Sequence, residues 1–223
     1  MKKALVLINP QVDFCSSSGA AYIKDGGKII QTINRLLATS IFKTVVGCQS
    51  YYPLNHKLFY TSHEGKKLYD VIEINKTQCT LLSKHCLMGE QGSEFSKDLL
   101  TGRLSAIFRK GMDSEDVIPS VFYNGTDPKL TGLSGYLKET FVKELYVAGV
   151  PFEYSVKESV LDALQLDFKV NVIIDACKSV NLKSKEEKEL IKKLEQAGAV
   201  VIKSDDLLKA GMRELNEKEG IQK

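Results

Sequence analysis

Short runs of aliphatic and β-branched residues recur along the chain, and each has the length of a buried strand. They cover residues 3–8, 41–48, 106–109, 145–150, 170–175 and 199–202, with a shorter run at 71–74. A run that is apolar throughout, without alternation, is typical of a parallel strand covered on both faces. The pattern therefore predicts a six-stranded, mostly parallel sheet.

Helical periodicity separates these runs. In residues 26–40, apolar side chains recur at three- and four-residue spacing, as expected of a helix with one face on a sheet. Similar patterns cover residues 133–141, 153–166, 184–197 and 205–212, and the pattern at 184–197 begins with a Ser-x-x-Glu capping box at Ser184. Alternating strands and helices predict an α/β fold, a three-layer α/β/α sandwich around a doubly wound sheet.

The pattern weakens between residues 49 and 104, where Tyr, Pro, Asn, His and Gly interrupt short apolar pieces. A connection of this length is too long for a plain loop and indicates a functional insertion. We predict one domain over residues 1–215 that contains the insertion, and a flexible C-terminal tail over residues 216–223.

Composition narrows the function classes. Of 223 residues, 43% are hydrophobic and 26% charged, and the formal net charge is only +3 without a basic stripe, so we expect no nucleic-acid partner. The apolar opening stops at Asn9, too early for a secretory signal or a membrane span, which predicts a cytoplasmic protein without membrane contact. Five scattered cysteines without a CxxC pair are expected to be free thiols.

Polar residues follow three of the predicted strands. Asn9 follows the first strand, Lys110 the strand at 106–109, and Ser155 lies just beyond the strand at 145–150, in the first turn of a helix. Loops at the carboxyl ends of parallel strands are where open α/β sheets bind ligands. Each residue also has a structural explanation, since Asn9 can form a turn, Lys110 can be a solvated loop residue and Ser155 can cap a helix.

Several segments together resemble the nicotinamidase and isochorismatase-like hydrolase family. The opening LVLINPQVDFC is similar to the strand-one motif of that family, FRKGMDSEDVIPSVF to its lysine motif, and VAGVPFEYSVKESVLDA to its nucleophile motif. CQSYYPLNHKLFY resembles the metal motif, and LSKHCLMGEQGSEF the segment that supplies a further histidine. The order of the fragments implies common ancestry and the fold of that family.

The resemblance implies a catalytic triad of Asp, Lys and Cys, but the aligned residues are Asn9, Lys110 and Ser155. An amide cannot accept the proton that the family's aspartate takes, and a hydroxyl is a poorer nucleophile than a thiol. The position whose backbone N–H serves the oxyanion hole aligns with Pro151, which has no N–H. The same proline is compatible with the family's cis bond at this position.

The implied metal and substrate positions differ too. His56 and His85 match two of the family's metal ligands, whereas Ser50 and Tyr52 stand at the other two positions. We expect either no metal or a weakly bound divalent, zinc-type ion. His63 and Cys86 are near enough in sequence to be recruited as ligands, but a solvated or structural role fits both better. Phe14 aligns with a residue that stacks on a small aromatic carboxamide or acid, although a core role fits equally well; the family's pocket tryptophan aligns with Leu82.

Three functional hypotheses remain. The first is a pseudoenzyme, a family member with substituted triad, oxyanion and metal positions and a binding or assembly role. The second is an active amidase that cleaves nicotinamide-like small carboxamides with Ser155 activated by Lys110. The third is a scaffold that pairs with itself or an active relative, because the resemblance also implies a homo-oligomer.

Overall fold

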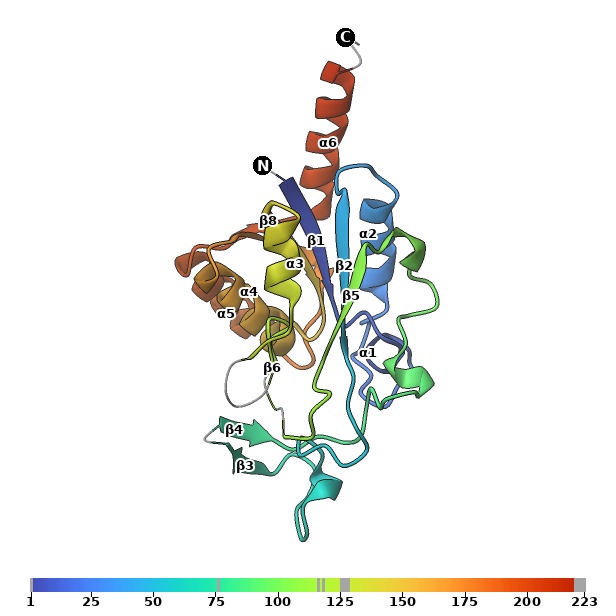
Figure 1. Ribbon diagram of the computed structural model, residues 1–223, viewed down its shortest axis with the longest axis vertical. Coiled ribbons are helices and arrows are strands. Elements are labelled where there is room, and N and C mark those ends of the chain that lie inside the picture. Colours follow the sequence, from blue (N-terminus) through green and yellow to red (C-terminus); the bar gives the residue numbers. More distant parts are fainter. Residues whose placement is uncertain (1, 76, 116, 118, 125–128, 219–223) are drawn as a thin grey trace.

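The computed structural model describes residues 2–218 except 76, 116, 118 and 125–128, and for 129 and 212–218 it describes the backbone alone. Its centre is a six-stranded sheet in the order β10-β9-β8-β1-β2-β5 (Figure 1). All five neighbouring pairs are parallel. The strands are β1 (Lys2–Ile8), β2 (Thr44–Ser50), β5 (Ala106–Lys110), β8 (Val142–Gly149), β9 (Lys169–Cys177) and β10 (Val200–Ile202). The predicted parallel sheet is confirmed.

Helices cover both faces of the sheet and complete the predicted three layers. One core contains the inward side chains of α2 (Lys28–Leu37) and the first turn of α6 (Ser204–Lys218). The opposite core contains those of α3 (Leu133–Glu139), α4 (Lys157–Gln165) and α5 (Ser184–Gln196). Figure 1 shows α2 on one side of the sheet and α3 to α5 on the other.

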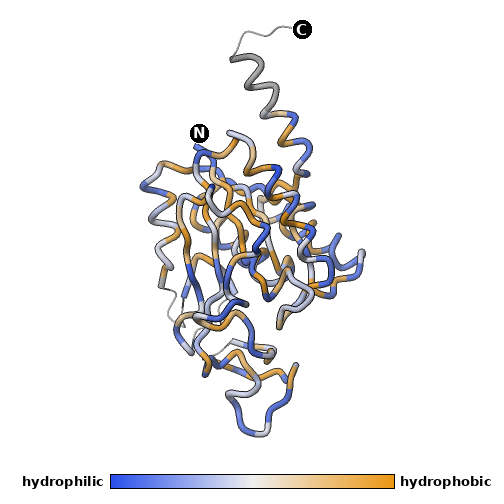
Figure 2. The backbone as a smooth tube through the Cα atoms, turned by 90° about the vertical axis from the view of Figure 1, so that its right-hand side faces the viewer, coloured by the Kyte–Doolittle hydropathy of each residue, from blue (hydrophilic) through white to orange (hydrophobic). Residues whose placement is uncertain are grey.

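The central strand β1 shows why an unbroken apolar run becomes this kind of strand. Ala4, Val6 and Ile8 belong to one core, and Leu5 and Leu7 belong to the other. Successive side chains of a strand point to opposite faces, so a strand between two helical layers needs apolar residues at every position. Figure 2 shows apolar, orange stretches running through the body of the molecule.

The first part of the predicted insertion, with β3 and β4, lies beyond the carboxyl ends of the strands at the lower end of Figure 1, and its last part runs back beside α2, where Asn34 bonds to Asp98 and Leu100. Its regular elements are short: η1 (Tyr60–Ser62), β3 (Val71–Ile74), β4 (Thr77–Thr80), η2 (Gln91–Ser93) and η3 (Thr101–Arg103). β3 was predicted, but its antiparallel partner β4 was not, because a run with one buried residue carries little apolar signal. Two further short elements, α1 (Val12–Cys15) and the pair β6 (Tyr123–Asn124) and β7 (Lys129–Leu130), were also not predicted.

Several boundaries differ from the predictions for local reasons. β8 begins at Val142 rather than 145, because Val142 is fully buried and pairs with Lys2 of β1. The segment after β8 begins as a π-helical turn, Phe152–Val156, before α4 follows. The cap of α5 lies one residue earlier than predicted, since the backbone N–H of Lys183 donates to the Glu186 carboxylate at 2.8 Å.

The C-terminal helix α6 is longer than the pattern predicted. It continues to Lys218, whereas we expected its end at 212 and a flexible tail from 216. Residues 219–223 of that tail lie outside the described part of the chain, and the single-domain boundary at 215 stays a prediction. No helix within the described residues is long and apolar enough to cross a membrane.

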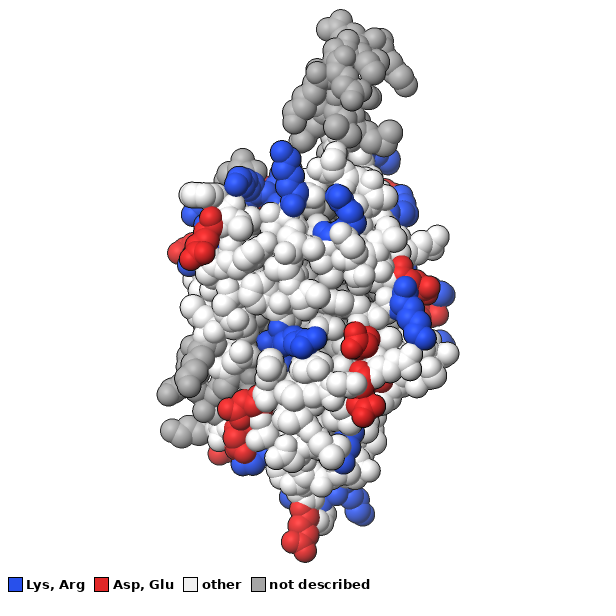
Figure 3. All heavy atoms as spheres, turned by 45° about the vertical axis from the view of Figure 1, so that its right-hand side comes forward, with Lys and Arg blue, Asp and Glu red and all other residues white. Residues whose placement is uncertain are grey.

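Charge is dispersed on the face drawn in Figure 3, where Lys and Arg side chains are separated by Asp, Glu and uncharged surface. The described ion pairs are isolated pairs of side chains, as between Lys28 and Asp25 at 3.0 Å and between Arg35 and Asp205 at 2.6 Å. A nucleic-acid interface needs a continuous basic footprint, and this face offers none.

Gly149, the last residue of β8, provides a test of the sheet's packing. Its φ is +141°, and a Cβ there would overlap the Ile8 carbonyl of β1. We expect Gly149→Ala to lower the free energy of unfolding by about 2–4 kcal/mol, measured by urea denaturation. The control is Gly102→Ala, where a Cβ meets no atom within 4 Å, and we expect a change within about 0.5 kcal/mol. Equal effects of the two changes would contradict this packing.

Candidate functional site

The predicted triad positions lie at the carboxyl ends of two central strands, β1 and β8, and of the edge strand β5. Asn9 follows β1, Lys110 ends β5, and Ser155 lies in the π-helical turn after β8. Asn9 is 0% exposed, Lys110 3% and Ser155 5%. Burial of three polar side chains requires local partners, and these partners decide what the site can do.

A directional chain of hydrogen bonds holds Asn9. The Tyr52 hydroxyl donates to Ser50 Oγ at 3.4 Å, and the Ser50 hydroxyl donates to Asn9 Oδ1 at 3.3 Å. The Asn9 amide nitrogen in turn donates to the Val150 carbonyl at 3.0 Å. An amide fits because it accepts on one side and donates on the other, whereas an ionised carboxylate offers no donor to that carbonyl.

Gln11 fixes the start of the insertion onto the end of β1. Its side-chain nitrogen donates to the carbonyls of Ser50 and Ser93, at 2.7 and 2.8 Å, and its oxygen accepts the backbone N–H of Ser50 at 2.9 Å. Gln11 is fully buried, so each of these bonds replaces water that the groups have lost. The backbone of Ser50 is thereby held rigidly beside Asn9.

The Tyr52 ring fills the space beside these groups. It lies edge-on to three rings, with centroid distances of 4.6 Å to His56, 5.3 Å to His85 and 5.7 Å to Phe59. The Lys110 amine lies 5.9 Å from its centroid, and a Cβ at Gly111 would overlap the ring. Tyr52 is itself only 6% exposed. A buried aromatic side chain of the protein thus packs between the candidate metal positions and Lys110.

The histidines are poorly arranged for a metal ion. His56 Nδ1 accepts the backbone N–H of Leu58 at 3.0 Å, so the neutral ring carries its proton on Nε2 and has no free lone pair there. His85 has the opposite tautomer, because its Nδ1 donates to the Ser83 carbonyl at 2.9 Å. Burial lowers the pKa of His85, so this ring is neutral at pH 7.

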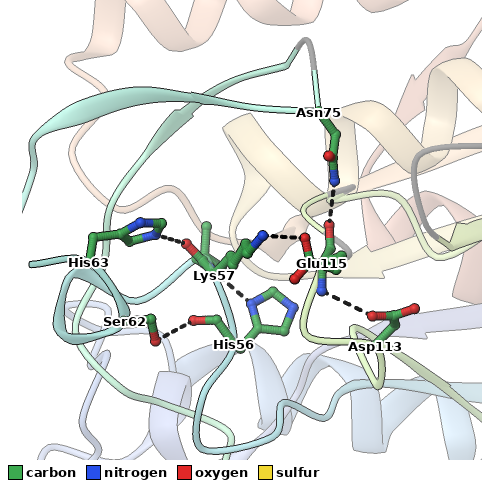
Figure 4. Close-up of polar contacts among 8 residues, drawn as sticks. His56, Lys57, Ser62, His63, Asn75, Asp113 and Glu115 are labelled. Carbon is green, nitrogen blue, oxygen red and sulfur yellow. Dashed lines mark hydrogen bonds and ion pairs between the residues drawn. The ribbon is translucent and has the colours of Figure 1, made fainter.

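The proposed alternative ligands have other partners. His63 Nε2 bonds to the Lys57 carbonyl at 2.8 Å, in a polar cluster where Lys57 pairs with Glu115 (Figure 4). Cys86 has a fully buried thiol. Within the described residues, no three His, Cys, Asp or Glu side chains are grouped to hold a metal ion. The residues present do not fit the ion that the resemblance implies.

The turn after β8 contains Ser155, the position that the resemblance assigns to the nucleophile. The Val150–Pro151 bond is cis, as expected, and Pro151 brings no N–H. The next N–H, that of Phe152, donates to the Lys178 carbonyl at 2.9 Å. Within the described part of the chain, the Ser155 hydroxyl makes no hydrogen bond to Asn9 or Lys110, the groups that a triad would place beside it.

The predicted substrate contacts lie on the core side of this region. Phe14 is 5% exposed and packs edge-on against His85, with 5.5 Å between centroids. Leu82 is half-buried, and its backbone bonds to Leu58 and Tyr60 join two segments of the insertion. Phe14 therefore has the core role that the sequence left open, and stacking on a ligand stays a prediction.

Asp13 is a buried carboxylate whose partners the sequence did not reveal. It accepts the backbone N–H groups of Cys86 at 2.6 Å and Ala20 at 2.9 Å. Its charge and that of Lys110 both act on His85 and on the Cys86 thiol. The only sequence signal was the x-Gln-x-Asp-Phe spacing, since the partners come from residues far along the chain.

Burial makes the five thiols poor nucleophiles. It raises the pKa of Cys15, Cys48 and Cys177 to about 12, and it also raises the pKa of Cys79 and Cys86. All five cysteines are free, as predicted. The thiolate is the reactive form of cysteine. None of these buried thiols is therefore suited to act as a nucleophile in place of Ser155.

The fold and the position of these loops define a class, the doubly wound α/β sandwiches with a site at the carboxyl ends of their strands. A family model described as the Isochorismatase domain matches residues 3–206. The chain belongs to the isochorismatase family.

Curated relatives and solved structures extend this result. Nicotinamidase of Escherichia coli (strain K12) is 31% identical, covering 89% of this chain and 93% of its own, and that of Acinetobacter baylyi is 33% identical, covering 80% and 82%. The structure of a nicotinamidase pyrazinamidase from Acinetobacter baumanii has a TM-score of 0.85 at 34% identity over 92% of this chain and 98% of that one.

Two further structures carry ligands. An L. infantum protein in complex with nicotinate is 26% identical with a TM-score of 0.79, covering 92% of this chain and 93% of that one. Pyrazinamidase of Pyrococcus horikoshii in complex with zinc has a TM-score of 0.71 over 91% and 99%; at 24% identity it supports the fold alone.

The hydrogen-bonding role of the Asn9 side-chain amide can be tested by replacing its NH₂ group with oxygen. Asn9→Asp places a carboxyl against the Val150 carbonyl, and burial raises the pKa of that carboxyl above the unfolded value of about 3.9. At pH 7 the free energy of unfolding of the variant should therefore be about 3 kcal/mol below that of wild type. This difference shrinks as the pH falls towards 4, because the buried carboxyl becomes protonated. Urea unfolding at both pH values measures it. Exposed Asn55→Asp is the control, and a pH-independent effect at Asn9 would contradict the assignment.

Thiol burial gives a second test. With Ellman's reagent at pH 8, we expect the native protein to react slowly at all five cysteines, because desolvation keeps them protonated. In concentrated urea all five should react rapidly, since the unfolded pKa is about 8.5. A native thiol that reacts as fast as in urea would contradict the buried, inert assignment.

Proposed function

We propose that this chain is a pseudoenzyme of its family, with a binding or assembly role in place of amide hydrolysis. The observation that carries the proposal is the Tyr52 side chain, which fills the space beside Asn9, Lys110 and Ser50. A substrate ring needs that volume to reach the nucleophile position. With this volume filled, the protein would not bind a substrate, in addition to lacking the reactive groups.

The chemistry at the triad positions supports the same proposal. Asn9 accepts from Ser50 and donates to Val150, so its amide is committed to structure and has no basic atom. General-base catalysis contributes roughly 10²- to 10⁴-fold, and one oxyanion donor is worth about 3 kcal/mol. The chain has neither at the aligned positions, and Phe152 is engaged with Lys178.

Relatives suggest the class of ligand that a retained binding function would take. The curated relatives are nicotinamidases, and the L. infantum relative holds nicotinate. A small aromatic carboxamide or acid is thus the first ligand class to test. Self-association as a homo-oligomer, or pairing with an active relative, is the assembly role that makes no use of the buried site.

A second candidate, an amidase that uses Ser155 with Lys110, is favoured by one observation. Lys110 is 3% exposed and forms no ion pair with another described residue. A desolvated lysine is the base that Ser-Lys hydrolases use. Against this, the Ser155 hydroxyl has no hydrogen bond to Lys110 among the described contacts.

Ammonia release from nicotinamide separates the two candidates. We expect the purified protein to release none above the blank, because base, oxyanion donor and pocket volume are all lacking. Lys110→Ala and Ser155→Ala should give the same baseline. Turnover by the wild type that Lys110→Ala abolishes would overturn the pseudoenzyme proposal and support the Ser155–Lys110 amidase.

The same assay applied to a restoration variant locates the defect. We expect Asn9→Asp, Pro151→Ala and Ser155→Cys together to stay inactive, because the Tyr52 ring still fills the pocket. Nicotinamide turnover by this triple variant would contradict the part of the proposal that rests on Tyr52.

A further inference from the structure

The family's metal position contains an organised set of side chains in this protein. Ser50, Tyr52, His56 and His85 stand at the positions that the resemblance assigns to metal ligands, and Phe59 packs among them. Tyr52 is in ring contact with both histidines, and its hydroxyl reaches Ser50. The four positions are therefore joined to each other through one side chain.

A metal ion at such a position joins segments that are distant in sequence. Here Tyr52 follows β2, His56 and Phe59 lie in the next loop, and His85 comes from beyond β4. Edge-to-face ring pairs contribute about 0.5–1.5 kcal/mol each beyond area burial. Tyr52 makes three of these contacts, to His56, His85 and Phe59. Several weak contacts from one rigid ring thus join the same segments.

The tautomers of the two imidazoles agree with a metal-free centre. A ligating histidine donates its second ring N–H to an acceptor. His85 meets this condition through Ser83, but His56 Nδ1 faces the Leu58 N–H donor, which forces the proton onto Nε2. One imidazole lone pair without a carboxylate falls short of the three protein ligands of a catalytic zinc site.

We propose that Tyr52 has taken the place of the metal ion, and that this chain folds around an aromatic and hydrogen-bonded centre that needs no metal. The Tyr52 ring contacts both His56 and His85, and its hydroxyl donates to Ser50, which stands at the position that the resemblance assigns to a metal-binding carboxylate. Gly111 is part of this centre, because a side chain there would displace the ring. The inference concerns folding and does not depend on whether the protein hydrolyses an amide.

Metal content and thermal unfolding of the full chain test this directly. We expect purified wild-type protein to hold far less than one equivalent of zinc, iron or manganese by mass spectrometry. Its Tm should be the same with EDTA and with added zinc. Stoichiometric metal, or a Tm that falls with EDTA, would overturn the proposal whatever the ammonia assay gives.

Two changes of Tyr52 separate its hydroxyl from its ring. Tyr52→Phe keeps the ring and removes one long hydrogen bond, so we expect the Tm to fall by about 2–4 °C. Tyr52→Ala removes the ring and leaves a cavity, so the fall should be about 6–15 °C. A Tyr52→Ala protein with the Tm of wild type would overturn the role of the ring.

A gain-of-binding variant tests the position itself. Ser50→Asp with Tyr52→His supplies a carboxylate and an imidazole, which with His85 make three ligands. Zinc at about 100 times its Kd should raise the Tm of this double variant by about 5–11 °C and leave wild type unchanged. A double variant that does not respond to zinc would overturn the assignment of Ser50 and Tyr52 to the metal position.

Discussion

The side chain of Tyr52 is the contact on which the rest of the site depends. Its ring packs against His56, His85 and Phe59, and its hydroxyl begins the chain of donors that passes through Ser50 to Asn9. Interiors are close-packed, so a ring in this space excludes another ring. Pocket closure and the absence of a metal-binding arrangement in the described residues thus have a common cause.

The polar residues in this region are consistent with that closure. Asn9 is an amide because its two neighbours require one acceptor and one donor, and the Asp13 side chain accepts the backbone N–H groups of Ala20 and Cys86. In a medium of low dielectric, each such group must be matched locally. Side chains such as Asn9 that are held in structural hydrogen bonds stabilise the site, but they are not available as bases for chemistry.

The fold was predictable because its signal is local. β1 is apolar at every position since it lies between two helical layers, and that requirement is visible in the sequence. β4 and the first turn after β8 were not predictable, because their pairing and π geometry depend on distant neighbours. The motifs indicated which positions to compare with the family, whereas the direction of the Tyr52 ring was not predictable, because Gly111 and His85, which contact it, lie far from it in the chain.

Diffraction from crystals grown with zinc and nicotinate would test the closed site most directly. The account predicts that the Tyr52 hydroxyl remains beside Ser50, that the ring remains between His56 and His85, and that the anomalous map at the zinc edge has no peak there. A Tyr52 ring turned out of the site, with nicotinate or a zinc peak in its place, would contradict it.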